Sequence, residues 1–193
     1  EIIREEMGIM ELDPLEEPII MRAIHTSADF DYLENLKFSE GAVTGAMEAI
    51  RKGATIVTDT NMAKTGINKT RLEKYGGRVL CFMADEDVAE AAKANGTTRA
   101  VASMNKAAQL EGPIIFAIGN APTALIRLLE LAENGKIHPE LIIGTPVGFV
   151  NVVESKELLL RQKNIPYIVA GGRKGGSNIA AAICNAIIYQ CER

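Results

Sequence analysis

The sequence predicts an α/β protein with a doubly wound, mostly parallel sheet that carries helices on both faces. Short, continuously apolar stretches alternate along the chain with longer segments of helical periodicity. These stretches lack the polar alternation of a half-exposed strand, which is typical of parallel strands that crossover helices cover on both faces. The sequence contains no internal repeat, low-complexity segment or linker, so we predict a single domain over residues 1–193.

Five of the apolar stretches are predicted to be strands. They cover residues 54–57, 78–82, 113–118, 141–143 and 166–170. In doubly wound sheets, ligands bind beyond the carboxyl ends of the strands. Every predicted strand except the second is followed by a loop rich in Gly, Pro, Thr or Asn, so we expect the binding loops at this edge of the sheet.

The predicted helices are recognised by apolar residues at helical spacing and by the residues that begin and end each helix. In chain order they cover residues 1–8, 14 to about 27, 41–51, 87–94, about 98–110, the segment from Leu125 to Ala132, the segment after Val150 and the segment from Ile179 to Ile187. Asp13 and Pro14 supply the N-cap and first position of the second helix. Because Pro18 lacks an amide donor, that helix either kinks or begins there. Gly8 and Gly53 end the first and third helices.

The candidate binding loops are rich in glycine and polar residues. They are residues 58–67, which we expect to be an irregular polar loop, and residues 119–123, 144–150 and 171–177. The last of these follows a strand and opens a helix, so its amides, the helix dipole, Arg173 and Lys174 suit an anion. A turn that uses glycine for its backbone geometry alone explains this loop equally well.

Composition excludes several classes of protein. The chain has a formal net charge of -4 and a pI near 5.4, and it has no long cluster of Lys and Arg, which argues against nucleic-acid binding. No apolar run reaches the roughly 18 residues of a membrane span. Cys81, Cys184 and Cys191 are odd in number and widely spaced. This spacing favours reduced thiols in a cytoplasmic protein over a disulfide framework or a metal site.

Residues 22–31 concentrate groups that carry, donate or accept protons. They include His25, one of only two histidines. Imidazole ordinarily titrates at about pH 6.5, so it switches between acid and base near neutrality. Arg22, Asp29 and Asp31 are local candidates to set its charge and tautomer. The alternative interpretation is structural, with the histidine ending an amphipathic helix and binding a backbone carbonyl.

Several separated stretches resemble the precorrin-8X methylmutases, the methyl-shifting isomerases of corrin-ring biosynthesis, and follow the order of that family. They are Arg22 to Asp29, which contains Arg-x-Ile-His, Thr58 to Ile67, Asn95 to Ser103, Ala117 to Leu125, Ile142 to Lys156 and the glycine-rich segment 171–177. Two of them, Ala-Ile-Gly-Asn-Ala-Pro-Thr-Ala-Leu and Gly-x-Pro-Val-Gly-Phe-Val, are too long to match by chance. The resemblance extends over nearly the whole chain.

The resemblance implies a homodimeric, cytoplasmic isomerase that shifts a methyl group within pyrrole ring C of (cobalt-)precorrin-8, giving hydrogenobyrinate or cobyrinate. His25 takes the place of the family's catalytic histidine and is expected to act as a general acid. The substrate carries acetate and propionate arms, which calls for cations and backbone amides around it. The substrate-binding residues that we expect are Arg22, Thr26, Ser27, Asp59, Met62, Lys64, Arg99, Asn120, Pro146, Gly148, Phe149, Arg173 and Gly175.

The same resemblance implies no cofactor and no metal held by the protein, because any cobalt is carried by the corrinoid itself. The expected partners are the corrinoid and a second copy of the chain, with no nucleic acid and no membrane. One alternative is a nucleotide-binding, Rossmann-like protein, but neither Gly-x-Gly-x-x-Gly nor a P-loop pattern is present. The other alternative is a tetrapyrrole carrier without catalytic activity.

Overall fold

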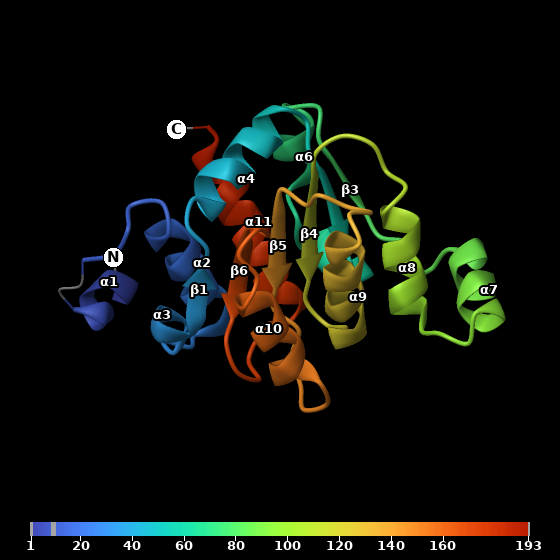
Figure 1. Ribbon diagram of the computed structural model, residues 1–193. Helices are drawn as coiled ribbons and strands as arrows, with labels where there is room; N and C mark the ends of the chain where they lie inside the picture. The colour runs from blue at the N-terminus through green and yellow to red at the C-terminus, as the bar shows by residue number, and fades with distance from the viewer. Residues whose placement is uncertain (1, 9–10, 193) are drawn as a thin grey trace.

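The computed structural model describes residues 2–8 and 11–192 and contains one six-stranded sheet (Figure 1). The strands follow the order β1-β6-β5-β4-β2-β3 across the sheet. They are β1 (Leu36–Phe38), β2 (Thr55–Thr58), β3 (Arg78–Leu80), β4 (Ile114–Ile118), β5 (Leu141–Gly144) and β6 (Tyr167–Ala170). The five strands β2 to β6 are parallel, which confirms the predicted mostly parallel sheet.

The edge strand β1 was not expected from the sequence. It pairs antiparallel with β6, with Leu36 opposite Ala170 and Phe38 opposite Ile168. Its three residues are too few to show a period, and only Leu36 is buried. The pairing is therefore a tertiary contact that no local sequence pattern indicates.

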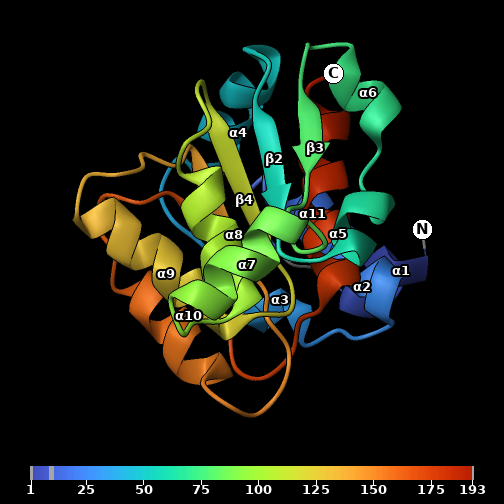
Figure 2. The same cartoon turned by 90° about the vertical axis from the view of Figure 1, so that its right-hand side faces the viewer.

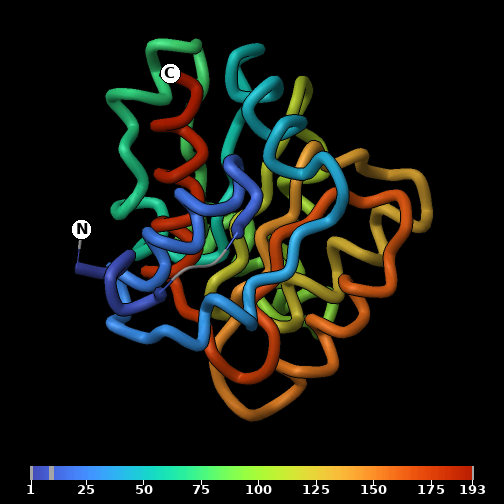
Figure 3. Tube along the Cα trace, turned by 90° about the vertical axis from the view of Figure 1, so that its left-hand side faces the viewer, coloured from blue at the N-terminus to red at the C-terminus, as the bar shows by residue number. Residues whose placement is uncertain are grey.

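Helices cover both faces of the sheet, as the doubly wound prediction requires. The helices are α1 (Ile2–Met7), α2 (Glu17–Ser27), α3 (Tyr32–Asn35), α4 (Ala42–Arg51), α5 (Asn61–Gly66), α6 (Lys69–Glu73), α7 (Glu86–Ala94), α8 (Arg99–Ala107), α9 (Pro122–Glu133), α10 (Val152–Leu160) and α11 (Ser177–Gln190). One layer contains α2, α4 and α11, with α5 and α6 beside α11 (Figure 2). The other contains α8, α9 and α10, and α7 packs outside α8. Figure 3 shows α2 lying along α11 on the side of the N-terminus.

The sheet divides the hydrophobic core in two because successive strand residues point to opposite faces. On β4, Ile115 and Ala117 pack into the core beneath α2, α4 and α11, whereas Phe116 and Ile118 pack beneath α8, α9 and α10. All five residues of β4 are buried. This double burial explains why the strands appear in the sequence as continuous apolar stretches.

The structure settles two local predictions, one on the start of the second helix and one on the segment 58–67. The second helix begins at Glu17 with Pro18 in its first turn, so Pro18 starts α2 and does not kink it. The Oδ1 atom of Asp13 accepts a hydrogen bond from the N–H of Leu15 at 2.8 Å, so Asp13 caps the turn before the helix. The prediction of an irregular loop over 58–67 is wrong, because residues 61–66 form α5.

The strand order places a topological switch between β2 and β4. These strands are neighbours in the sheet, but the chain continues from β2 to β3 at one edge and from β4 to β5 on the other side. The connections leave the carboxyl edge in opposite directions, which opens the crevice where doubly wound proteins bind ligands. Asp59 and Gly119, the first residues after β2 and β4, lie at this point.

Candidate functional site

The switch point is filled by the side chain of Asp59. Its carboxylate accepts hydrogen bonds from the N–H groups of Gly119 at 2.9 Å, Asn120 at 2.8 Å and Ala121 at 2.6 Å. Asp59 is only 1% exposed, and this burial raises its pKa against the lowering effect of the three amides. Its buried carboxylate supports the loop that begins α9, and the contact of Asp59 with the substrate stays a prediction.

This arrangement also bears on nucleotide binding. A phosphate at the switch point would need the loop amides at the start of α9. The carboxylate of Asp59 already occupies the amides of Gly119, Asn120 and Ala121. The site therefore presents a buried anion where a Rossmann-like protein presents free donors.

The glycine-rich loop 171–176 is attached tightly to the loop after β5. The N–H of Gly176 donates to the carbonyl of Thr145 at 2.8 Å, and the N–H of Gly148 donates to the carbonyl of Arg173 at 3.2 Å. A Cβ atom on Gly175 would lie 2.1 Å from the Thr145 carbonyl oxygen, and Gly175 has a φ of +156°. Glycine is therefore required at 175 by close backbone approach.

Two lysine side chains hold this glycine-rich loop in place, Lys174 within the loop and Lys156 of α10. Lys174 pairs with Asp29 at 2.7 Å and with Asp31, which ties the loop to the segment after α2. The hydrogen bonds that Lys174 donates to these carboxylates raise its pKa, and the same contact lowers the pKa of Asp29. Lys156 of α10 lies beneath the loop and donates to the carbonyls of Gly172 at 2.9 Å and Lys174 at 2.7 Å. Asp29 and Asp31 thus serve Lys174, and neither has a hydrogen bond to His25 in the part of the chain that the structure describes.

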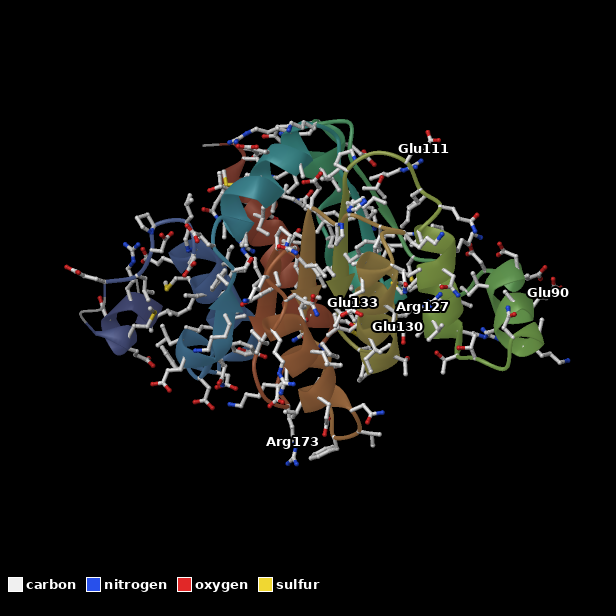
Figure 4. The ribbon with its side chains drawn as sticks, in the orientation of Figure 1. Glu90, Glu111, Arg127, Glu130, Glu133 and Arg173 are labelled. Carbon is white, nitrogen blue, oxygen red and sulfur yellow. The ribbon has the colours of Figure 1, made fainter. Side chains whose placement is uncertain are left out.

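The loops after β5 and β6 form a rim at the carboxyl edge of the sheet. On the outer part of this rim, the cation of Arg173 lies beside the exposed ring of Phe149. The guanidinium of Arg173 lies 5.2 Å from the centre of the Phe149 ring, and Phe149 is 80% exposed. Figure 4 shows Arg173 extending from the lower end of the molecule, beyond the carboxyl ends of the strands. A flat, apolar ligand edge that carries a carboxylate suits this pair, because arginine binds carboxylates while the ring packs on the apolar edge.

His25 lies in a separate cavity between α2 and α11. The cavity has a volume of about 320 Å³ and is lined by Ile3, Pro18, Met21, Arg22, His25, Ala186, Tyr189 and Gln190. Arg22 and His25 share one face of α2 because they are three residues apart. His25 is exposed and lines the cavity with its imidazole, so the structure makes it accessible to a ligand.

The opposite wall of this cavity contains residues that the sequence did not single out. The Tyr189 ring lies between two guanidinium groups, with Arg22 at 4.6 Å and Arg71 at 4.4 Å from its centre. Gln190 is 6% exposed, and its Nε2 atom has no hydrogen-bond partner among the described residues. A buried amide without a partner is costly, which makes Gln190 a notable residue in the lining of this cavity. Only the spatial neighbourhood of α2 and α11 reveals these residues.

The remaining predicted residues lie in several places. Ser27 closes α2, since its hydroxyl donates to the Ala23 carbonyl at 2.8 Å and accepts from the N–H of Asp29. Thr26 is exposed on the last turn of α2. Four further predicted residues lie near the carboxyl edge with exposed or half-buried side chains. They are Met62, Lys64, Arg99 and Asn120. Pro146 is buried in the loop after β5.

The structure therefore divides the predicted residues between two regions. The rim at the carboxyl edge gathers Phe149, Arg173 and the glycine loop, and the cavity gathers Arg22 and His25. α11 connects the regions, with Ser177 at the rim and Gln190 at the cavity. At 1.5 Å per residue, these two ends of the helix lie about 20 Å apart.

Residues 2–8 and 11–192 contain no group of three or more His, Cys, Asp or Glu side chains arranged to hold a metal ion. Within the same residues, every helix is too short or too polar to cross a membrane. The three cysteines are buried and unpaired thiols.

Comparison with known proteins identifies close relatives over nearly the full chain. The family model described as precorrin-8X methylmutase matches residues 1–190. The chain is 46% identical to the cobalt-precorrin-8 methylmutase of Priestia megaterium, over 97% of this chain and 83% of that protein. It is 48% identical to the protein of the same name from Salmonella typhimurium, over 91% of this chain and 82% of the relative. The crystal structure of precorrin-8X methylmutase from Thermus thermophilus superposes with a TM-score of 0.89 at 40% identity and covers 98% of this chain and 91% of that one.

Proposed function

The chain belongs to the precorrin-8X methylmutase family of isomerases, and we propose that it shifts a methyl group within pyrrole ring C of precorrin-8 or cobalt-precorrin-8, with His25 as general acid. The product is hydrogenobyrinate or cobyrinate, which has the same mass as the substrate. The observation that carries this proposal is the accessible imidazole of His25 in a cavity that also contains Arg22 and the unpaired amide of Gln190.

The reaction requires a proton transiently, but the substrate neither gains nor loses atoms, and only the position of the methyl group changes. Migration of the methyl group from an α carbon to the adjacent β carbon is favoured when the conjugated macrocycle is transiently protonated. An imidazolium at His25 donates this proton and recovers it after migration, which balances the proton over one turnover. The protein also orients ring C against the imidazole and excludes water from it.

The rim supports binding of the carboxylate arms of the substrate. Arg173 is exposed beside Phe149, and Arg99 is exposed at the start of α8. Guanidinium groups bind carboxylates with charge-assisted hydrogen bonds. Thus an acidic protein offers cations locally to a polyanionic ligand.

We also propose that the working form is a homodimer. The cavity of about 320 Å³ is at the low end of the roughly 300–1,000 Å³ that encloses drug-sized ligands, and a corrinoid is larger. A second copy supplies the remaining walls of the pocket. Two-fold symmetry then makes the contact self-complementary.

The proposed activity is tested by incubating the purified protein with metal-free and cobalt-bearing precursor. The proposal predicts a change in the absorbance spectrum with no change in product mass. A tetrapyrrole carrier would bind the corrinoid but leave its spectrum unchanged after a full turnover time. The same experiment decides which of the two precursors is the substrate.

A further inference from the structure

Lys156 is a buried cation for which the proposed reaction has no use. It is 1% exposed, although lysine is almost never fully buried without a paired charge. Among the described residues, its Nζ donates to the backbone carbonyls of Gly172 and Lys174 and to no other group. Burial lowers the pKa of Lys156 from 10.5 to about 8, and no neighbouring charge offsets this effect. The protein therefore keeps a costly group under one loop, which points to a functional role.

The two carbonyls that Lys156 binds determine where two N–H groups point. In a trans peptide, the carbonyl of one residue and the N–H of the next point in opposite directions. The structure contains no cis peptide among its described residues. Since the carbonyls of Gly172 and Lys174 point to Lys156, the N–H groups of Arg173 and Gly175 point away from it.

Neither of these N–H groups donates a hydrogen bond to another described residue. Both belong to peptides whose positive ends are turned outward over a buried ammonium. The N–H groups of Arg173 and Gly175 are therefore two backbone donors of one loop without a partner among the described residues, and such donors suit an anion. The buried charge of Lys156 adds to their positive potential because no carboxylate is paired with it.

We propose that Lys156 is a positioning residue that orients the amides of Arg173 and Gly175 to bind one carboxylate arm of the corrinoid. This inference rests on the proposed function and names the place where one arm of that substrate binds. Lys156 acts through the loop and does not touch the reacting ring. Its loss therefore weakens binding and leaves the chemical step intact.

Titration of Lys156 gives the inference its distinctive signature. Lys174, the other cation of the loop, is held charged by Asp29 and Asp31, which raise its pKa. The remaining titratable groups on α10 and on the elements packed against it are Glu154, Glu157, Tyr167, Arg127, Glu130 and Glu133. None of them is a cause of the lowered pKa of Lys156. Affinity that falls as pH rises through about 8 is therefore attributable to this ammonium.

The test compares the parental protein with Lys156→Met and Lys156→Gln, and it uses the corrinoid product as the probe. Lys156→Gln keeps a donor without the charge, and it serves if the methionine variant does not fold. The control is Lys163→Met, which removes an exposed lysine. We expect the dissociation constant to rise about tenfold or more in both Lys156 variants, the scale of a lost charge-assisted contact, with kcat within about threefold of the parental value.

Two further measurements separate positioning from general damage. The affinity of the parental protein should weaken between pH 7 and pH 9, whereas that of the Lys156 variants should stay flat. A product whose carboxylate arms are all converted to amides should bind the parental protein and the variants alike. Equal affinity and an unchanged pH profile in a folded variant would overturn the inference. Failure of the proposed function has a different result, because the parental protein itself would then bind no corrinoid, and the inference would fall with it.

Discussion

Asp59 and Lys156 show how single buried charges shape the loops at the carboxyl edge. Asp59 accepts hydrogen bonds from three backbone N–H groups, and Lys156 donates to two backbone carbonyls. The carboxylate of Asp59 thus interacts with the positive ends of backbone dipoles, and the ammonium of Lys156 interacts with their negative ends. One charge fixes the start of α9 and the other fixes the glycine-rich loop.

Replacement of Asp59 tests the supporting role that the structure gives it. In Asp59→Asn, an NH₂ group faces backbone donors and leaves buried N–H groups unsatisfied, so we expect the free energy of unfolding to fall by about 2–4 kcal/mol. Denaturant titration measures this change. The control Glu90→Gln, at an exposed position of α7, should change stability very little. An Asp59→Asn protein of parental stability would contradict the role.

The rim arginines are expected to contribute to affinity. Arg173→Ala or Arg99→Ala should weaken binding of the corrinoid product by about 1.5–3 kcal/mol, the usual scale for hydrogen bonds to charged groups. Arg161→Ala is the matched control because its side chain is 74% exposed, directly after the end of α10. Titration calorimetry measures all three. Unchanged affinity in both rim variants would place these arginines in solvent and remove the rim from the binding site.

At the scale of elements, the sequence predicted the parts that carry a long pattern. All five strands of the parallel sheet and the amphipathic helices were expected close to their observed positions, because double burial and helical spacing leave clear patterns. β1, α3, α5 and α6 were missed because they have three to six residues and depend on neighbours distant in sequence. The hydrogen bond from the Ala63 N–H to the Thr60 hydroxyl identifies the start of α5 only once the fold is known.

The sequence located the site less completely than the fold. It identified Arg22, His25 and Arg173 from residue chemistry and family resemblance, and the structure places all three at accessible positions. It did not indicate that Asp59 is buried and supports the start of α9, because burial is a tertiary property. It missed Gln190, whose significance lies in a cavity between two helices from opposite ends of the chain.

The packing of α10 beneath the glycine-rich loop predicts a specific pH dependence of stability. The folded pKa of Lys156 is about 8, below its ordinary 10.5, so the unfolded chain binds more protons between these values and stability rises with pH there. At about 1.4 kcal/mol per pKa unit, the parental protein should gain about 3 kcal/mol relative to Lys156→Met between pH 7 and 10.5. Denaturant titrations across that range measure the difference. A difference independent of pH would show that burial does not lower the pKa of Lys156 in the folded protein.

At the scale of the molecule, the predicted site residues lie in two separate regions, and we predict that a homodimer completes the binding site. The cavity at His25 and the rim at Arg173 are joined by α11 but remain distinct. A homodimer brings a second set of loops to each cavity, so we expect a mass of two chains by light scattering at assay concentrations. Dilution should lower specific activity once the dimer dissociates. A monomer with full activity would contradict this prediction.

We propose that the imidazole of His25 supplies the proton for methyl migration. The most direct test is single-turnover conversion of the corrin precursor by His25→Ala, with His25→Asn as a variant that hydrogen-bonds but cannot carry the proton. Both variants should fold and bind the corrinoid product, and both should lose about 10²–10⁴-fold in rate, the range typical of a general acid. A folded His25→Ala protein that isomerises the precursor at a rate near that of the parental protein would contradict the claim.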